Sequence, residues 1–254
     1  MENKVTERYS YNQKPKMILF DVGGTLFDDS KCIPYDGLEA LRLTAKNPDI
    51  TSGEKLTQIW EEYMAETSTG HKSNSGTILD FPLTAAIKYV TMQTGLKYDI
   101  SINEQEEIFD RFNSSRKVIK GVPELLKAID LLGIRTAVIS NNAMSGEGLA
   151  LAVKHWIPEE KMEFFLTSAD ILLTKPSSNI FTAAANFSGL STAECWYCGD
   201  SKIPDVDGAR NAGMTPVLLD TSSELPSEMR TDGSNREYMA VNCWDILREH
   251  LLTL

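Results

Sequence analysis

The sequence lacks three features that would point to particular classes of protein. Its 254 residues contain only four cysteines, at positions 32, 195, 198 and 243, which are too few and too scattered for a disulfide framework. No apolar run approaches the roughly 18 residues of a membrane span, and residues 1–16 contain no apolar signal segment. We therefore expect a cytoplasmic protein with reduced thiols and no membrane partner.

The chain also lacks an excess of positive charge. Its formal net charge is -11, so its surface repels phosphate backbones and anionic lipids at long range, which argues against nucleic acid as a partner. A small anionic substrate stays possible, because a bound cation and local hydrogen-bond donors can reverse the sign of the charge inside one cleft. With 42% apolar residues, the chain has the composition of a folded globular protein.

Short apolar runs rich in Val, Ile, Leu and Phe predict the strands of a sheet. These runs are nearly continuous in apolar residues rather than alternating, which is typical of parallel strands buried on both faces. They lie at residues 17–22, 134–140, 162–167, 195–199, 215–219 and, more weakly, 238–241. Helices are predicted between or after them at 123–132, 177–188, 205–212 and 243–252. We expect an α/β fold with a doubly wound parallel sheet.

More than a hundred residues separate the first two predicted strands, which is far more than a crossover connection needs. Amphipathic patterns in that stretch predict four helices, at 35–46, 54–66, 78–94 and 104–112. We therefore predict a core formed by residues 1–28 and 117–254, with residues 29–116 inserted as an all-helical cap domain. The polar stretch 221–237 is predicted to be a long exposed loop.

Polar residues follow the predicted strands where a parallel sheet binds its ligands, at the carboxyl ends. Asp21 and the turn Gly23–Gly24–Thr25 follow the first strand, and Ser140 and Asn141 end the second. Asp200 and Asp205 follow the fourth strand, and Lys175 lies beyond the third. Grouped carboxylates can hold Mg²⁺, while an ammonium, a hydroxyl and backbone N–H groups can bind phosphoryl oxygens. The sequence thus predicts phosphoryl transfer to a carboxylate.

Four segments in this order resemble the motifs of haloacid dehalogenase-like hydrolases. They read FDVGGTLF at 20–27, VISN at 138–141, KP at 175–176 and GDSKIPD at 199–205. The segments KGVPELL at 120–126 and GARNAG at 208–213 strengthen the match. Each motif is weak alone, but together they span the predicted core. The resemblance implies a Rossmann-like core whose helical cap closes over the active site.

The resemblance also implies a role for each matching residue. Asp21 would be the nucleophile that forms an aspartyl-phosphate, with Ser140 and Lys175 steadying the phosphoryl group. The substrate-binding residues would be Gly24, Thr25, Ser140, Asn141 and Lys175. Mg²⁺ would be surrounded by the Asp21, Asp200 and Asp205 carboxylates and the backbone carbonyl of Gly23. The expected partner is a small phosphorylated substrate.

Gly23 departs from the phosphatases of this family, which have a second aspartate at that position. That aspartate protonates the leaving oxygen, a contribution on the order of 10²- to 10⁴-fold in rate. One reading keeps a phosphatase, either with the acid supplied by another group such as Asp28, Asp29 or a cap residue, or with slow turnover. A second is carbon–halogen or carbon–phosphorus cleavage, since family members with these activities also lack this aspartate. A third is a non-catalytic phospholigand-binding protein.

The pair Cys195 and Cys198 forms a Cys-x-x-Cys spacing, which in other contexts marks a redox pair or half of a zinc site. Here both cysteines fall inside a predicted strand, where residues three apart point to opposite faces. We therefore expect both thiols to have packing roles.

Overall fold

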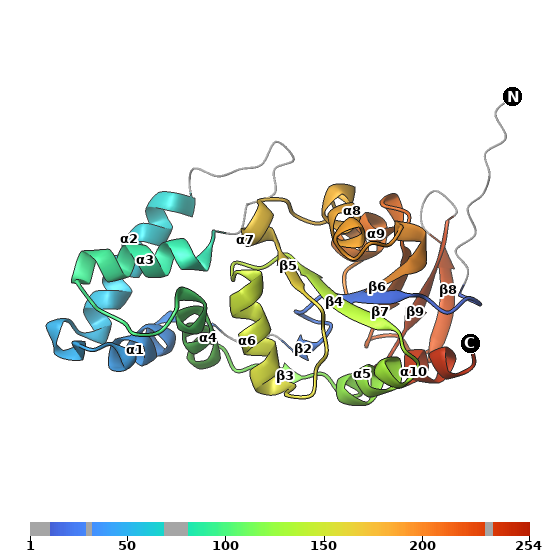
Figure 1. Ribbon diagram of the computed structural model, residues 1–254, viewed down its shortest axis with the longest axis horizontal. Coiled ribbons are helices and arrows are strands. Elements are labelled where there is room, and N and C mark those ends of the chain that lie inside the picture. The colour runs from blue at the N-terminus through green and yellow to red at the C-terminus, as the bar shows by residue number, and fades with distance from the viewer. Residues whose placement is uncertain (1–10, 29–31, 69–80, 232–235) are drawn as a thin grey trace, which may run out of the picture. The chain divides into compact units, whose positions relative to one another are not determined.

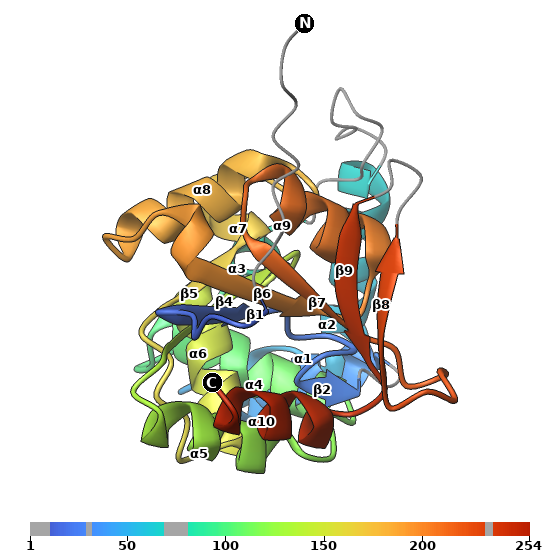
Figure 2. The same cartoon turned by 90° about the vertical axis from the view of Figure 1, so that its right-hand side faces the viewer.

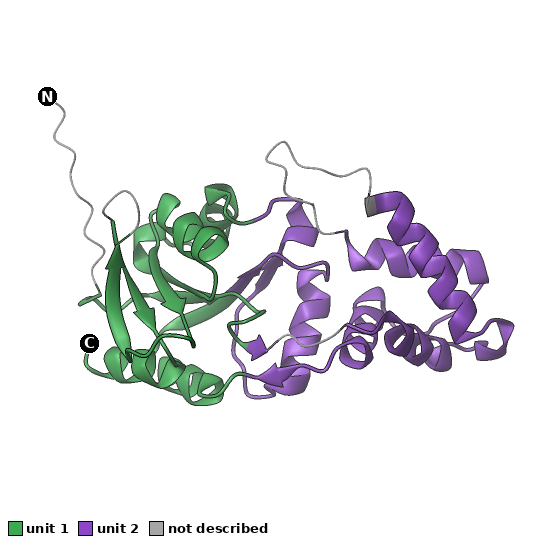
Figure 3. Ribbon diagram, turned by 180° about the vertical axis from the view of Figure 1, so that it is seen from behind, with its two compact units in different colours: residues 1–26, 119–137, 175–254 green, residues 27–118, 138–174 purple. Residues whose placement is uncertain are grey.

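The computed structural model describes residues 11–28, 32–68, 81–231 and 236–254. The chain divides into two compact units, each assembled from segments that are separate in the sequence (Figure 3). The first unit consists of Met1–Leu26, Ile119–Ala137 and Lys175–Leu254. The second consists of Phe27–Val118 and Val138–Thr174.

The first unit is built on strongly apolar strands. Strands β1 (Met17–Phe20), β6 (Cys195–Gly199), β7 (Thr215–Leu219) and β9 (Glu237–Val241) pair in parallel in that order. Strand β8 (Ser227–Thr231) pairs antiparallel with β9 at the edge. Every residue of β1, β6 and β7 is buried, as strands covered on both faces require.

Helices cover both faces of these strands. In Figure 2, α5 (Val122–Leu131) and α10 (Trp244–Leu252) lie on one side, and α8 (Ser178–Phe187) and α9 (Gly208–Asn211) lie on the other. Trp244 is fully buried under the sheet, where its ring meets that of Phe20 edge to face at 6.2 Å. The α/β class predicted from the sequence is therefore confirmed.

The complete sheet has the strand order β5-β4-β1-β6-β7-β9-β8 (Figure 1). Strand β4 (Arg135–Ser140) begins in the first unit and ends in the second, where it pairs in parallel with β5 (Phe165–Thr167). Two short helices precede and follow β6: η2 (Thr192–Glu194) and the π-helix η3 (Lys202–Asp207). The helix predicted at 205–212 is thus formed by the end of η3 followed by α9.

The second unit contains mostly helices. Its four main helices in the inserted stretch are α1 (Pro34–Thr44), α2 (Gly53–Ser68), α3 (Leu83–Thr94) and α4 (Ile102–Asn113). Helices α1 and α4 pack together, and the ring of Trp60 on α2 stacks on Phe109 of α4 at 4.9 Å. The four predicted cap helices are found here, although residues 78–80 of the third lie outside the described residues.

Several shorter elements complete the second unit. The 3₁₀ turn η1 (Pro48–Ile50) lies between α1 and α2, and β2 (Phe27–Asp28) pairs antiparallel with β3 (Lys117–Val118). Helix α6 (Gly146–Trp156), which the sequence did not predict, packs against α4 and β5. Helix α7 (Ser168–Ile171) follows β5.

One prediction for the C-terminal part was wrong. The stretch 221–237, expected to be a loop, contains β8. Its residues alternate between exposed and partly buried, and it pairs with β9 along its whole length. Because its side chains are mostly polar, the sequence pattern did not indicate a strand.

The boundaries predicted for the cap, 29–116, stay a prediction. Grouping by contacts puts residues 138–174 with the helical segments, because α6 packs against α4 in the second unit. Within the described ranges, every helix is too short or too polar to cross a lipid bilayer.

Candidate active site

Three aspartates of the first unit come together at the carboxyl end of its strands. Asp21 follows β1 directly, and its backbone N–H donates to the carbonyl of Cys198 on β6 at 2.9 Å. Asp200 follows β6, and Asp205 lies in the π-helix η3. One carboxylate oxygen of each lies within 4.8 Å of the others. Parallel pairing of β1 with β6 thus produces the cluster that the sequence predicted.

The oxygens of this cluster fit a divalent cation. Three carboxylates within 4.8 Å form a hard-oxygen donor set of the kind that Mg²⁺ or Ca²⁺ prefers. Gly24, with φ of +65°, lies so close to Asp200 that any Cβ at position 24 would collide with its carboxylate. A turn that passes this close to a carboxylate requires glycine, both for its conformation and for space.

Lys175 lies between two of the aspartates. Its Nζ is 2.9 Å from Asp21 Oδ1 and 2.7 Å from Asp205 Oδ1, and the residue is only 3% exposed. Burial alone would lower the pKa of Lys175, but the charges of Asp21 and Asp205 outweigh burial and raise it. The side chain is therefore an ammonium ion that neutralises part of the carboxylate charge.

The remaining charge in the cluster is negative. Burial raises the pKa of Asp205, although Lys175 opposes the shift, and partial burial together with the charges of Asp205 and Asp21 raises that of Asp200. Asp205 Oδ2 also accepts a hydrogen bond from the backbone N–H of Ser201 at 2.9 Å. One ammonium among three carboxylates leaves an excess negative charge, which a cation would relieve.

Sequence reasoning missed Tyr197 of β6. Its hydroxyl accepts a hydrogen bond from Lys175 Nζ at 2.8 Å and lies 3.4 Å from Asp205 Oδ1, to which it donates. Burial, with the charges of Asp205 and Asp21, raises the pKa of Tyr197 well above its ordinary value, so the hydroxyl keeps its proton. A tyrosine in a strand predicted to be buried on both faces could have indicated this contact, because a buried phenolic hydroxyl usually has a hydrogen-bond partner.

The other residues predicted to bind substrate or metal differ in burial and are divided between the two units. Thr25 is fully buried and its carbonyl accepts a hydrogen bond from Trp244 Nε1 at 2.8 Å, whereas Gly23 is half-buried. Ser140, buried at the end of β4 and paired with Thr167, belongs to the second unit, as does the half-buried Asn141. Their convergence with Asp21 and Lys175 stays a prediction.

Both residues suggested as substitute acids lie near the start of the predicted cap. Asp28 is exposed in β2 and belongs to the second unit. Asp29 lies outside the described residues. An acid that replaces the aspartate missing at Gly23 therefore stays a prediction too.

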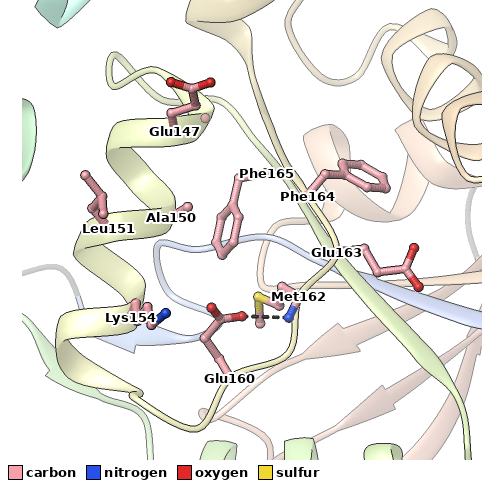
Figure 4. A pocket seen from close by; sticks show the side chains of 10 residues that line it. Glu147, Ala150, Leu151, Lys154, Glu160, Met162, Glu163, Phe164 and Phe165 are labelled. Carbon is pink, nitrogen blue, oxygen red and sulfur yellow. Dashed lines mark hydrogen bonds between the residues drawn. The ribbon is translucent and has the colours of Figure 1, made fainter. Parts of the chain in front are cut away.

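The second unit contains a pocket that the sequence did not predict. It has a volume of about 420 Å³ and lies between α6 and residues 160–165 (Figure 4). Its wall is mixed: Leu151, Met162 and Phe165 are apolar, whereas Glu147 and Lys154 on α6 are charged. None of its lining residues belongs to the predicted active site.

Comparison with known families identifies a family whose matched region includes the clustered residues. The sequence profile of the haloacid dehalogenase-like hydrolases matches residues 18–219, a range that includes Asp21, Lys175, Asp200 and Asp205. The chain belongs to this family. It is accordingly a hydrolase of the haloacid dehalogenase-like type, as the four motifs predicted.

Individual relatives of this hydrolase have two kinds of activity in their names. A glyceraldehyde 3-phosphate phosphatase from Methanopyrus kandleri is 26% identical over 235 residues, which cover 85% of this chain and 89% of the relative. The crystal structure of 2-haloacid dehalogenase from Pseudomonas syringae pv. Tomato DC3000 has a TM-score of 0.57 and 20% identity, covering 94% of this chain and 99% of that one. At that identity the likeness shows the fold alone.

A further solved structure also shares the fold. The phosphatase of the same superfamily from Thermococcus onnurineus has a TM-score of 0.51 and 17% identity, covering 93% of this chain and 97% of that one. Dehalogenases and phosphatases thus share this architecture, so the choice between the two activities depends on the residues of the site.

Proposed function

We propose that this hydrolase is a magnesium-dependent phosphatase that acts on small phosphorylated metabolites, with Asp21 as its nucleophile. The observation that carries the proposal is the cluster of Asp21, Asp200 and Asp205 around the Lys175 ammonium. A dehalogenase attacks an uncharged carbon, so no repulsion between two anions has to be overcome. Three carboxylates that fit a cation favour attack on an anionic phosphoryl group instead. The curated phosphatase relative supports the same choice.

In the proposed reaction, a carboxylate oxygen of Asp21 attacks phosphorus and the bond from phosphorus to the ester oxygen breaks. This gives an aspartyl-phosphate and an alcohol, and water then releases inorganic phosphate and restores Asp21. Bound Mg²⁺ would supply positive charge to the phosphoryl oxygens, held by Asp21, Asp200, Asp205 and the carbonyl of Gly23. Lys175 orients Asp21, because its Nζ lies 2.9 Å from Asp21 Oδ1. Ser140 and Asn141 would bind phosphoryl oxygens.

The leaving oxygen needs a proton in the first step, and Gly23 has none to give. A phenolate leaves without protonation, whereas an alkoxide does not. We therefore expect this protein to hydrolyse aryl phosphates faster than alkyl phosphates, by up to about 10²- to 10⁴-fold if no other group supplies the proton.

The test is hydrolysis of an aryl and an alkyl phosphate with and without Mg²⁺. Asp21→Asn should abolish turnover, whereas Asp207→Asn is a matched control, because Asp207 lies in the same π-helix and pairs with Arg210 outside the cluster. Turnover that needs both Mg²⁺ and Asp21 supports the proposal. No turnover of either ester when Mg²⁺ binds would contradict it, and would favour a phospholigand-binding protein or cleavage of carbon–halogen or carbon–phosphorus bonds.

A further inference from the structure

The Lys175 ammonium contacts three side chains of the first unit. Its Nζ donates hydrogen bonds to Asp205 Oδ1 at 2.7 Å and to the Tyr197 hydroxyl at 2.8 Å, and it forms an ion pair with Asp21 Oδ1 at 2.9 Å. An ammonium has only three donors, so the hydrogen bonds to Asp205 and Tyr197 restrict its orientation strongly. Tyr197 is the one neutral member of the set, and the four family motifs do not include it.

Tyr197 itself is held in one place by its surroundings. It lies in the middle of β6, opposite Leu19 of β1 and Pro216 of β7, and it is fully buried. Its ring packs edge to face against Phe181 of α8, with ring centres 4.9 Å apart. A side chain packed between two strands and a helix can hold an ammonium without moving, because protein interiors are close-packed.

The contact with Lys175 is made by the oxygen rather than by the ring. The ammonium lies 2.8 Å from the hydroxyl but 5.4 Å from the ring centre. Having accepted from Lys175, the hydroxyl directs its own proton to Asp205 Oδ1, 3.4 Å away. Lys175, Tyr197 and Asp205 therefore close a ring of hydrogen bonds beside Asp21, and removing the hydroxyl would break two of its three sides.

We propose that Tyr197 is a positioning residue, whose hydroxyl accepts a hydrogen bond from Lys175 and so holds the ammonium against Asp21. The proposal rests on the proposed function, in which Asp21 is the nucleophile. Tyr197 makes no contact with substrate in this scheme. Its removal should therefore slow the attack by Asp21 and leave substrate affinity unchanged.

The first test compares Tyr197→Phe with Tyr11→Phe. Tyr11 is also buried in the first unit, but its hydroxyl donates to the Pro216 carbonyl at 2.6 Å and accepts from the Met239 N–H at 3.0 Å. Both changes remove one oxygen with two hydrogen bonds from the interior. We expect Tyr197→Phe to lower kcat for an aryl phosphate about tenfold, as loss of one hydrogen bond to a charged group does, with KM within about twofold. Tyr11→Phe should lower the melting temperature and leave kcat unchanged.

Two kinetic results would overturn the proposal. One is a kcat for Tyr197→Phe within about twofold of that of the unaltered protein. The other is an equal loss of kcat in both variants, which would assign the effect to general loosening of the core.

A second measurement does not depend on hydrolysis. Among the described residues Lys175 is the one buried lysine, so in protein labelled with ¹⁵N-lysine its ammonium protons should exchange slowly enough to give an NMR signal. Tyr197→Phe should shift or remove this signal, and Tyr11→Phe should not. A signal that is absent from the unaltered protein, or that Tyr197→Phe leaves in place, overturns the proposal. If the signal responds but the unaltered protein hydrolyses no phosphate, the contact stands and the proposed phosphatase activity fails.

Discussion

The Lys175 ammonium compensates the negative charge of the Asp21 and Asp205 carboxylates, which would otherwise repel each other. Removing one partner of a buried ion pair typically costs about 3–5 kcal/mol, because the remaining charges are left uncompensated. We therefore expect Lys175→Met to lower the free energy of unfolding by about this amount, measured by urea titration with circular dichroism. Lys202→Met, a change at an exposed lysine of η3, should alter stability by less than about 0.5 kcal/mol.

The double variant Lys175→Met, Asp205→Asn separates charge repulsion from lost packing. If repulsion causes the loss, removing one buried carboxylate should recover part of it, so the double change will cost less than the sum of the two single changes. Strict additivity would contradict this account of Lys175.

The cysteines should differ sharply in reactivity. Burial raises the pKa of Cys195 to about 11, with a further rise from the charge of Glu194, and burial raises the pKa of Cys198 as well. Cys32 is exposed. We expect iodoacetamide at neutral pH to modify Cys32 in the native protein, and Cys195 and Cys198 only after unfolding, as followed by peptide mass spectrometry. Rapid native labelling of either strand cysteine would contradict their packing role.

At the scale of single residues, the sequence predicted the charged part of the site because position alone decides it. Asp21 and Asp200 directly follow strands that pair in parallel, so they must lie at the same sheet edge. Tyr197 could not be predicted in the same way. In the sequence CWYCG it looks like one more core aromatic, and only the fold places its hydroxyl beside Lys175.

Among the helices, α6 is held at its start by two carboxylates. Glu106 of α4 accepts hydrogen bonds from the N–H of Ser145, at 3.0 Å, and from its hydroxyl, and Asp170 accepts from the N–H of Gly146 at 3.0 Å. Carboxyl oxygens placed at a helix N-terminus act as acceptors for its free N–H groups. The loop that follows Ser140 and Asn141 is thereby tied to α4.

This contact predicts a pH-dependent effect of Glu106→Gln. Burial raises the pKa of Glu106, so the folded protein binds its proton more readily than the unfolded chain does. The contribution of this carboxyl to stability is therefore complete below its unfolded pKa and declines as the pH rises through its folded pKa. We expect the loss of unfolding free energy in Glu106→Gln to be larger at pH 5 than at pH 8.

The matched control is Glu107→Gln, which changes the next residue of α4, a half-buried glutamate 3.4 Å from Arg111. Its effect on stability should be small at both values of pH. An effect of Glu106→Gln that is equal at pH 5 and pH 8, measured by denaturant unfolding, would show that the carboxyl titrates alike in the folded and unfolded chain.

Local sequence explains why α6 and β8 were harder to predict than the core strands. Helix α6 begins with Gly146 and Gly148, which weaken a helical pattern, yet a Cβ at either would collide with Phe165 or Glu106. Tertiary contacts, which cannot be seen in the sequence, therefore require glycine at these two positions. Strand β8 is polar because it lies at an edge, and β9 supplies the partner that defines it.

For the molecule as a whole, the way the helices pack predicts the outcome of removing the insert. Helix α6 packs against α4, so a chain in which a short flexible linker replaces residues 29–116 would lose the cover of α6. We expect such a chain to bind a hydrophobic dye such as ANS and to unfold at lower denaturant concentration than the full chain. A shortened chain that unfolds cooperatively without binding dye would favour an insert that is independent of α6.

Strand β8 also bears on how the folded protein behaves at high concentration. An open strand edge is a template on which another chain can add, and this is a common start of aggregation. Here the edge strand is only five residues long, and Arg230 on it pairs with Asp220 and Glu228. An intruding strand would have to desolvate these charges, which discourages amyloid-like stacking along this side of the sheet.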